Sequence, residues 1–381
     1  MIFLDHAATT PVRREALEAM WPFLSGSFGN PSSHHALGDE ASRALADARA
    51  AVAAVIGCRP GDVVFTSGGT EADNLAVKGL ALANPRGRHL VVSPIEHEAV
   101  LESAAYLERV HGFEISRVEV DAGGLVTPEA LARVVRPDTA LVSVQLANNE
   151  IGTVQPIAEL AAVAHAAGAL MHTDAVQAAG WLPLSLDALG VDALSLAGHK
   201  VGAPKGTGAL VVRGRLQLEP VLHGGGQERG RRSGTENVAG AVAFATALRL
   251  AEAERADAAA RVASLGTEFT ATIAATVPGA QPTGDPEHRL PGTISFVFPG
   301  TSGEAVLLEL ERDGVVCSSG SACAAGSDEP SHVLTAIGLP AELAQTAVRF
   351  TLGAETTAAE MTDAAASVAR AVSAVRGIVA T

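Results

Sequence analysis

Three positions in this sequence place reactive or ligand-binding groups directly after short apolar runs. The segment SGGT, residues 67–70, leads from VVFT into a helical pattern, Asp174 ends the run LMHTD, and Lys200 follows ALSLAGH. Backbone N–H groups at a helix N-terminus bind phosphate, and a carboxylate at the tip of a buried strand needs a cation. A lysine amine can form an imine. Together these are the protein groups that pyridoxal phosphate (PLP) requires.

Each of these positions also has a simpler interpretation. Gly69 and Thr70 fit the start of an ordinary capped helix, and Asp174 with His172 fits a metal site. No cluster of Cys and His with metal-ligand spacing completes such a site. Gln177 lies three residues after Asp174, within reach of the same ligand. Because the phosphate-binding turn, the acid and the lysine occur together, the sequence favours the cofactor site.

A fourth candidate is Cys323, in the segment CSSGSACAAGSDEPSHVL. Between Ser318 and Asp328 no side chain is larger than a thiol, so the segment cannot pack a core. It is predicted to be a flexible loop that presents a sulfur to a partner, although an incidental surface cysteine is the alternative. Cys58 is expected to be an incidental thiol and Cys317 a small buried apolar residue. We predict no resident metal, with a transient cluster or metal contact at Cys323 left open.

Alternating strand and helix patterns predict an α/β fold with a mostly parallel sheet covered on both faces. The predicted strands are 63–66, 89–93, 114–120, 140–146, 170–174, 193–196 and 208–212. The predicted helices between them are 36–56, 70–83, 99–110, 127–135 and 157–167. A long helix at 237–275 leads to a smaller α+β part, with strands at 293–298, 315–317 and 347–352 and helices at 303–312 and 357–375. In such sheets ligands bind beyond the carboxyl ends of the strands.

Composition and charge restrict the class of protein. The chain has 381 residues, 48% of them hydrophobic, and a net charge of −15. This charge argues against a nucleic-acid partner or an anionic membrane surface. The start MIFLDHAATT does not resemble a signal peptide. Three cysteines without close pairing are typical of a reducing compartment, so we expect a cytoplasmic protein.

These residues belong to a longer series of motifs that resembles a known family. The motifs are, in order, LDHAATTP, FGNPSSHH, FTSGGTEADNLA, EHEAV, ANNEIGTVQPI, HTDAVQAAG, GHKVGAPKG, HGGGQERGRRSGTENV, SSGSACAAGSDEPSHVL and VRFTLG. The chain is similar over nearly its whole length to cysteine desulfurases of the NifS/IscS type, which are class-V PLP enzymes of fold type I. The resemblance implies a large PLP-binding domain at 13–255 with a seven-stranded sheet. It also implies a small domain at 256–381, on which residues 1–12 pack and which carries the catalytic cysteine loop.

The resemblance also implies roles around the cofactor ring. Lys200 is the residue that forms the imine with PLP, and Asp174 pairs with the ring nitrogen. Gln177 contacts the ring hydroxyl. His97 stacks over the ring and moves protons.

At the other end of the cofactor, the implied phosphate ligands are Thr70 with the Gly69 turn, His199, and Thr235 from the partner subunit of a homodimer. Asn149 and Arg349 are implied to bind the substrate carboxylate, for which a guanidinium fork is suited.

The implied reaction converts L-cysteine to L-alanine and leaves the sulfur on Cys323 as a persulfide. An unperturbed thiol has a pKa of about 8.5, so only a few per cent is thiolate at neutral pH. Activation is expected from His97 or from the substrate thiol. The sulfur would then pass to an acceptor protein, such as an iron–sulfur scaffold or a tRNA-thiolation enzyme.

Three features depart from the family pattern. Ala197 stands where many members place a serine on the phosphate, and Gly202 with Ala203 alters the turn after the lysine. The sequence stops at Thr381, without the tail by which longer members dock a scaffold. The alternative functions are another class-V enzyme, such as an aminotransferase or a selenocysteine or cystine β-lyase, and a redox protein that uses Cys317 and Cys323.

Overall fold

A computed structural model describes residues 1–84, 86–320 and 329–379. Cys323 therefore lies outside the described residues. Its largest sheet contains seven strands: β2 (Val63–Thr66), β3 (His89–Val92), β4 (Glu114–Arg117), β5 (Thr139–Ser143), β6 (Leu170–Asp174), β7 (Ala193–Ala197) and β8 (Gly208–Val212). Their order is β2-β8-β7-β6-β5-β3-β4, with β8 antiparallel to both of its neighbours and the other adjacent pairs parallel. The predicted α/β class and mostly parallel sheet are confirmed.

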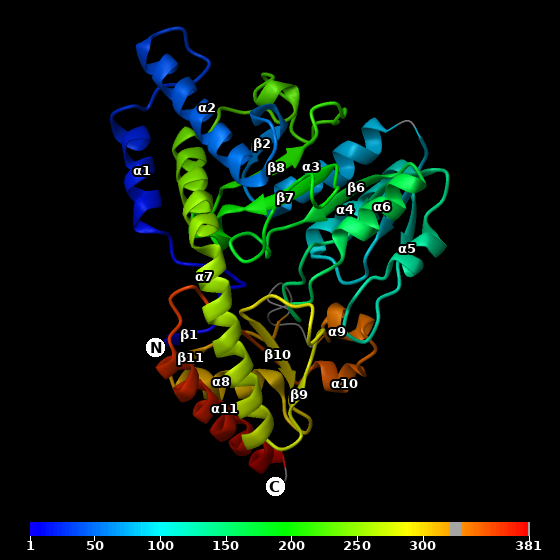
Figure 1. The fold of residues 1–381 in the computed structure, drawn as a ribbon, viewed down its shortest axis with the longest axis vertical. Helices are drawn as coiled ribbons and strands as arrows, with labels where there is room; N and C mark the ends of the chain where they lie inside the picture. The colour runs from blue at the N-terminus through cyan, green and yellow to red at the C-terminus, as the bar shows by residue number, and fades with distance from the viewer. Residues whose placement is uncertain (85, 321–328, 380–381) are drawn as a thin grey trace.

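Seven helices accompany this sheet in the described chain: α1 (Arg14–Ser25), α2 (Ala36–Ile56), α3 (Gly69–Ala83), α4 (Glu98–His111), α5 (Pro128–Val134), α6 (Ile157–Ala166) and α7 (Val238–Thr276). Short 3-10 turns are η1 (Pro60–Asp62), η2 (Gly198–Lys200) and η3 (Glu228–Gly230). We call the sheet and these helices the large lobe, of which α7 is only partly a member (Figure 1).

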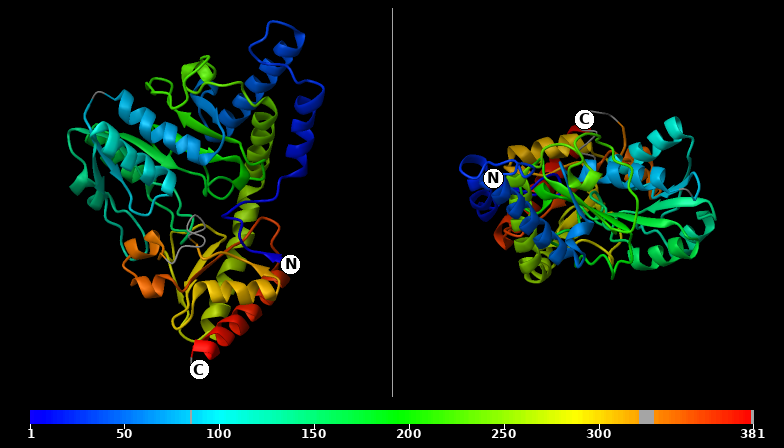
Figure 2. Two further views of the ribbon diagram at one scale, coloured as in Figure 1. Left: turned by 180° about the vertical axis from the view of Figure 1, so that it is seen from behind. Right: turned by 90° about the horizontal axis from the view of Figure 1, so that it is seen from above.

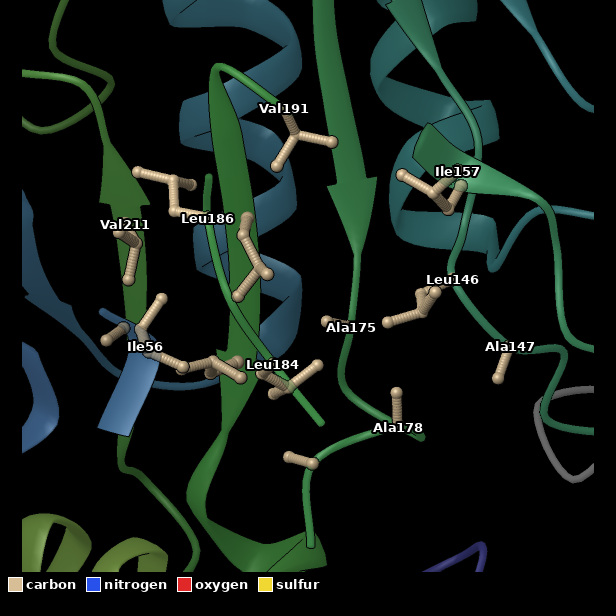
Figure 3. Packing of buried hydrophobic residues seen from close by; sticks show 14 of the residues in the cluster. Ile56, Leu146, Ala147, Ile157, Ala175, Ala178, Leu184, Leu186, Val191 and Val211 are labelled. Carbon is tan, nitrogen blue, oxygen red and sulfur yellow. The ribbon is translucent and has the colours of Figure 1, made fainter. Parts of the chain in front are cut away.

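Alternating side chains along the strands bury both faces of the sheet. On one face, Ile56 of α2, Ile157 of α6 and Val211 of β8 belong to a single cluster of buried apolar side chains (Figure 3). On the other face, Leu210 packs with Leu75 and other residues of α3 and α4. Because both faces are covered, polar groups become accessible mainly at the strand ends.

The small lobe is built on short strands. Its strands are β1 (Ile2–Phe3), β9 (Gln281–Pro282), β10 (Thr293–Val297), β11 (Val315–Val316) and β12 (Ala347–Thr351). Its helices are α8 (Gly303–Arg312), α9 (His332–Ala336), α10 (Ala341–Ala344) and α11 (Ala358–Val379). β10 lies antiparallel between β12 and β9, while β1 pairs in parallel with β11. The N-terminus therefore lies in this lobe (Figure 2).

Helix α7 runs along both lobes (Figure 1). Phe244 and Leu248 belong to the apolar cluster of the large lobe, whereas Val262, Phe269 and Ile273 belong to that of the small lobe. The predicted boundary between residues 255 and 256 falls inside this helix, and it stays a prediction. Among the described helices, none is both long and apolar enough to cross a membrane.

Candidate active site

A cavity of about 480 Å³ lies where the carboxyl ends of the large-lobe strands face the small lobe. It is lined by nine of the predicted site residues: Gly69, Thr70, His97, Asn149, Asp174, Gln177, His199, Lys200 and Arg349. Thr235 is exposed and does not line it. Nine residues that are distant in the sequence thus surround one space.

Asp174 stands at the end of β6 and is 8% exposed. Burial raises the pKa of its carboxyl, while His97, the Val176 N–H and Lys200 lower the pKa in that order. The Val176 N–H donates to Oδ1 at 2.8 Å. The carboxylate therefore faces a cavity in which a further cation would favour its charged form.

Two more buried carboxyls stand beside Asp174 that sequence reasoning missed. Asp73 of α3 lines the cavity and its Oδ1 has no hydrogen-bond partner, while its pKa is raised by burial and then by the charge of Asp174. Glu96 is fully buried, with Oε1 accepting from the Gln145 N–H at 2.8 Å and Oε2 unpartnered. Burial raises its pKa, as does Asp174. No sequence signal singled out either one, because helix and loop acids are usually solvated.

Behind these acids lies His172, fully buried on β6. Its ring nitrogens lie 2.9 Å from Ser143 Oγ and 3.0 Å from Ser195 Oγ. Burial lowers its pKa to about 3, so the ring is neutral at physiological pH. Among the described residues no group of three or more His, Cys, Asp and Glu side chains is arranged to hold a metal ion.

Lys200 ends the turn η2 and reaches the N-terminal segment. Its Nζ donates to the carbonyl oxygens of Ala7 and, at 2.8 Å, of Ala8. Gln177 Nε2 also donates to Ala7 O, at 3.0 Å. The motif LDHAATTP thus supplies backbone acceptors to the site, a function that its side chains do not reveal. Lys200 and Gln177 also line a second cavity, of about 450 Å³.

His97 caps the N-terminus of α4. Its Nδ1 accepts the Ala99 N–H at 3.0 Å. In the neutral ring this places the proton on Nε2, so Nε2–H is the free donor of the imidazole. The cap therefore fixes both the orientation and the tautomer of a ring that lines the cavity.

The turn that is predicted to bind phosphate leads directly into α3. Gly68 takes φ 157° and precedes α3 without a side-chain cap, which leaves the first N–H groups of the helix for a ligand. A Cβ at Gly69 would lie 2.9 Å from Val176 Cγ2, so a larger residue cannot replace it without displacement. Ala197, one of the departures from the family pattern, is buried beside it, 3.4 Å from the same position.

His199 and the turn after Lys200 complete this end of the cavity. His199 Nδ1 lies 3.2 Å from Thr9 Oγ1, and burial followed by the charges of Lys200 and Lys205 lowers its pKa to about 4. A neutral ring can still share a hydrogen bond with a phosphate. Gly202 adopts φ 87°, and its carbonyl accepts the Arg13 N–H at 2.8 Å, which fixes the turn.

Arg349 projects from β12 on the small-lobe side and is 2% exposed. It donates to Asp5 Oδ1 at 2.8 Å, to Asn149 O at 2.8 Å and to Gly320 O at 3.1 Å. Its buried Nε has no partner. Asp5 does not line the cavity, so the ion pair holds the guanidinium from behind.

The residues present fit PLP. The buried acid at the end of β6, the helix N-terminus after β2 and the lysine after β7 would supply its three anchoring contacts. Asp73 Oδ1 has no hydrogen-bond partner and lies 3.8 Å from His172 Nε2, so this carboxyl adds to the acidic character of the site around Asp174.

Comparisons with known proteins agree. The model of the class-V aminotransferase family matches residues 2–363. Cysteine desulfurase IscS of Dictyoglomus turgidum is 46% identical over 93% of this chain and 90% of its own length. The putative cysteine desulfurase IscS 1 of Bacillus subtilis is 46% identical over 97% of both chains. A solved NifS-like protein superposes with a TM-score of 0.91 at 37% identity, covering 98% of this chain and 99% of that one. The resemblance predicted from the sequence is confirmed, and the chain belongs to the class-V aminotransferase family of PLP enzymes, in its NifS/IscS-type group.

Proposed function

We propose that this protein is a PLP-dependent cysteine desulfurase that converts L-cysteine to L-alanine and transfers the sulfur to Cys323. The observation that carries the proposal is the cavity between the lobes. There a lysine, a buried acid and a phosphate-binding turn from the large lobe face a buried arginine from the small lobe. The lysine, the acid and the turn suit the cofactor, and the arginine suits the carboxylate of an amino-acid substrate.

The large-lobe residues hold the cofactor. Lys200 attaches it covalently, and Asp174 pairs with its ring nitrogen. Thr70 and His199, with the N–H groups after Gly68, hold its phosphate. Bound PLP supplies an electron sink that weakens bonds at the substrate α- and β-carbons.

Substrate orientation falls to the other side of the cavity. Arg349 with Asn149 binds the carboxylate, for which the buried guanidinium already has a fixed plane because Asp5 and two carbonyls accept its protons. His97 covers the cofactor ring, and Gln177 contacts the ring hydroxyl. Lys200, whose Nζ donates to Ala8 O at 2.8 Å, would move protons at the substrate Cα.

Sulfur transfer balances without an external oxidant. The Cys323 thiolate attacks the substrate sulfur, so an S–S bond forms as the Cβ–Sγ bond breaks. The electron pair left on Cβ takes up a proton, and L-alanine leaves. Cys323 then carries the persulfide. An ordinary thiol is only slightly ionised at neutral pH. Because Nε2 of the neutral His97 ring already carries a proton, the ionised substrate thiol takes the Cys323 proton.

The test compares two variants in L-cysteine turnover. Cys323→Ala should bind PLP normally but form no persulfide at residue 323 and lose alanine production. Lys200→Ala should lose the covalently held cofactor and its yellow colour. Wild-type alanine formation by Cys323→Ala would instead favour another class-V activity, such as a β-lyase. A colourless wild-type protein would favour the redox alternative with Cys317 and Cys323.

The proposal extends to partners. Thr235 is exposed in this chain, which supports its role in the site of the other subunit of a homodimer. Sedimentation should then give a dimer. Thr235→Ala should weaken phosphate binding, and mixing it with Lys200→Ala should restore one intact site per heterodimer, because the Lys200→Ala subunit supplies Thr235 to its partner. An acceptor such as an iron–sulfur scaffold or a tRNA-thiolation enzyme would receive the sulfur. Cys58 and Cys317 are free thiols, in keeping with the predicted cytoplasmic location.

A further inference from the structure

The two ends of the segment that carries Cys323 are held by different parts of the protein. At the first end, Gly320 O accepts from Arg349 Nη1 at 3.1 Å, and Ser318 pairs with the backbone of Arg349 on β12. At the second end, Ser331 Oγ donates to Glu150 Oε2 at 2.6 Å, and His332 Nε2 lies 3.0 Å from Glu96 O. The first end therefore bonds within the small lobe, whereas the second, at the start of α9, bonds across to the large lobe.

The Glu150 side chain accepts a hydrogen bond from one end and lies close to the other. It follows β5 in the motif ANNEIG and is 4% exposed. A Cβ built at Gly320, which has φ 95°, would lie 3.3 Å from Glu150 Oε2, so backbone and carboxyl are already in close approach. The carboxyl also lines the cavity together with Gly320 and Ser331.

The environment of Glu150 explains how a carboxyl is tolerated there. Burial raises its pKa, while the Ser331 hydroxyl, His332 and Arg349 lower it in that order. Its backbone is also fixed, because Asn148 Oδ1 accepts the N–H groups of Glu150 and Ile151 at 2.8 and 2.9 Å. A buried acceptor with a rigid backbone and one short hydrogen bond is suited to positioning another segment.

We propose that Glu150 is a positioning residue for sulfur transfer. It acts through its bond to Ser331 and its packing against Gly320, and so fixes both ends of the segment at the cavity wall. This inference rests on the proposed function, in which the Cys323 sulfur must meet the substrate sulfur. Misplacement of reacting groups by about 1 Å can lower a rate by about 10²-fold.

The experiment separates the cofactor step from the sulfur step in the holoenzyme. Stopped-flow absorbance follows the change in the cofactor spectrum when L-cysteine is added. Single-turnover quenching with intact-protein mass measures persulfide on Cys323. The variants are Glu150→Ala, Glu150→Gln and Ser331→Ala. Ser302→Ala is the matched control, because Ser302 caps α8 in the same lobe as Ser331 caps α9, but Ser302 lies outside the cavity lining.

Glu150→Ala and Ser331→Ala should slow persulfide formation about tenfold or more while the spectral step stays within about twofold of wild type. Glu150→Gln should keep most of the rate, because its amide oxygen can still accept from Ser331. Ser302→Ala should match wild type in both steps. Cofactor content and thermal unfolding are measured for each variant. If Glu150→Ala does not fold, the test is the persulfide rate, which should be near wild type in Glu150→Gln and reduced in Ser331→Ala.

Three outcomes would overturn the inference: a wild-type persulfide rate in Glu150→Ala, equal slowing of both steps, or equal losses in Glu150→Gln and Glu150→Ala. The first two deny a role in sulfur positioning, and the third makes charge rather than the hydrogen bond responsible. If Cys323→Ala abolishes alanine formation in the same assays, the proposed function stands even though the role of Glu150 fails.

Discussion

The two sides of the cavity differ in how their charges are compensated. On the large-lobe side, the buried carboxyls Asp73, Glu96 and Asp174 stand together, with the His97 ring and the Lys200 ammonium near Asp174. On the small-lobe side, Arg349 is buried but already paired with Asp5 at 2.8 Å. The acid side therefore still favours a cation or a proton. On the arginine side, Asp5 already neutralises the charge of Arg349. The guanidinium therefore offers a substrate well-placed hydrogen-bond donors rather than net positive charge.

The largest expected effect concerns the acid side. Asp174→Asn should weaken PLP binding to the apoprotein by about 10- to 100-fold, because a hydrogen bond to a charged group contributes about 1.5–3 kcal/mol. Asp73→Asn should change it by less than about threefold, since two neighbouring buried carboxyls cannot both be ionised and the proton stays on Asp73. Equilibrium titration of the apoprotein with PLP measures both. Equal losses in the two variants would show that Asp73 also contributes a negative charge.

A smaller effect is expected on the arginine side. Arg349→Lys should raise KM for L-cysteine about tenfold with kcat little changed, because an ammonium keeps the charge but loses the planar fork. Steady-state alanine production measures this change. Asp5→Asn is the control, because its amide oxygen can still accept from Nη2 and hold the plane. If Arg349→Lys has wild-type KM, charge alone binds the carboxylate and the contrast between the two sides disappears.

A third expected effect is a pH dependence of stability. A carboxyl whose pKa is raised by folding binds its proton more tightly in the folded state, so it costs stability as pH rises above its ordinary value, which is 4.5 for Glu96. Glu96→Gln, which has no such proton, should therefore become more stable relative to wild type as the pH rises above 4.5, by about 1.4 kcal/mol per unit of pKa shift. Urea unfolding of the apoproteins at each pH measures the difference. A difference that is constant with pH would mean that Glu96 does not titrate in this range.

Much of the fold could be predicted from the sequence because its strands are short, apolar and bounded by Gly, Asn or Asp. The predicted ranges 63–66, 170–174 and 208–212 agree with β2, β6 and β8. β5 ends at Ser143, three residues before the predicted end, because the polar stretch from Gln145 turns toward Glu96. Helix α1 was missed although its apolar residues recur at helical spacing, because it contains Pro22, which argues against a helix interior.

Site residues could be predicted where they stand directly after a strand. They could not be predicted where only burial in the folded protein makes an ordinary side chain unusual. Asp174 and Lys200 stand at strand ends, so their positions follow from topology. Asp73, Glu96 and Glu150 are ordinary acids in helices or connections, and only the packed structure shows that water cannot reach them. Short strands such as β1 exist because a distant partner pairs with them, which is also why Asp5 beside Arg349 could not be foreseen.

Helix α7 has one further consequence. Its 39 residues span about 58 Å. Residues 252–261, midway along it, include no buried side chain, whereas both flanking stretches are anchored in an apolar cluster. Because α7 is continuous, a change in the angle between the lobes must bend the helix in this stretch without buried side chains. It cannot occur by a hinge motion in a loop. The distance between two spectroscopic probes placed on either side of residues 252–261 would report bending of α7 without disturbing either core.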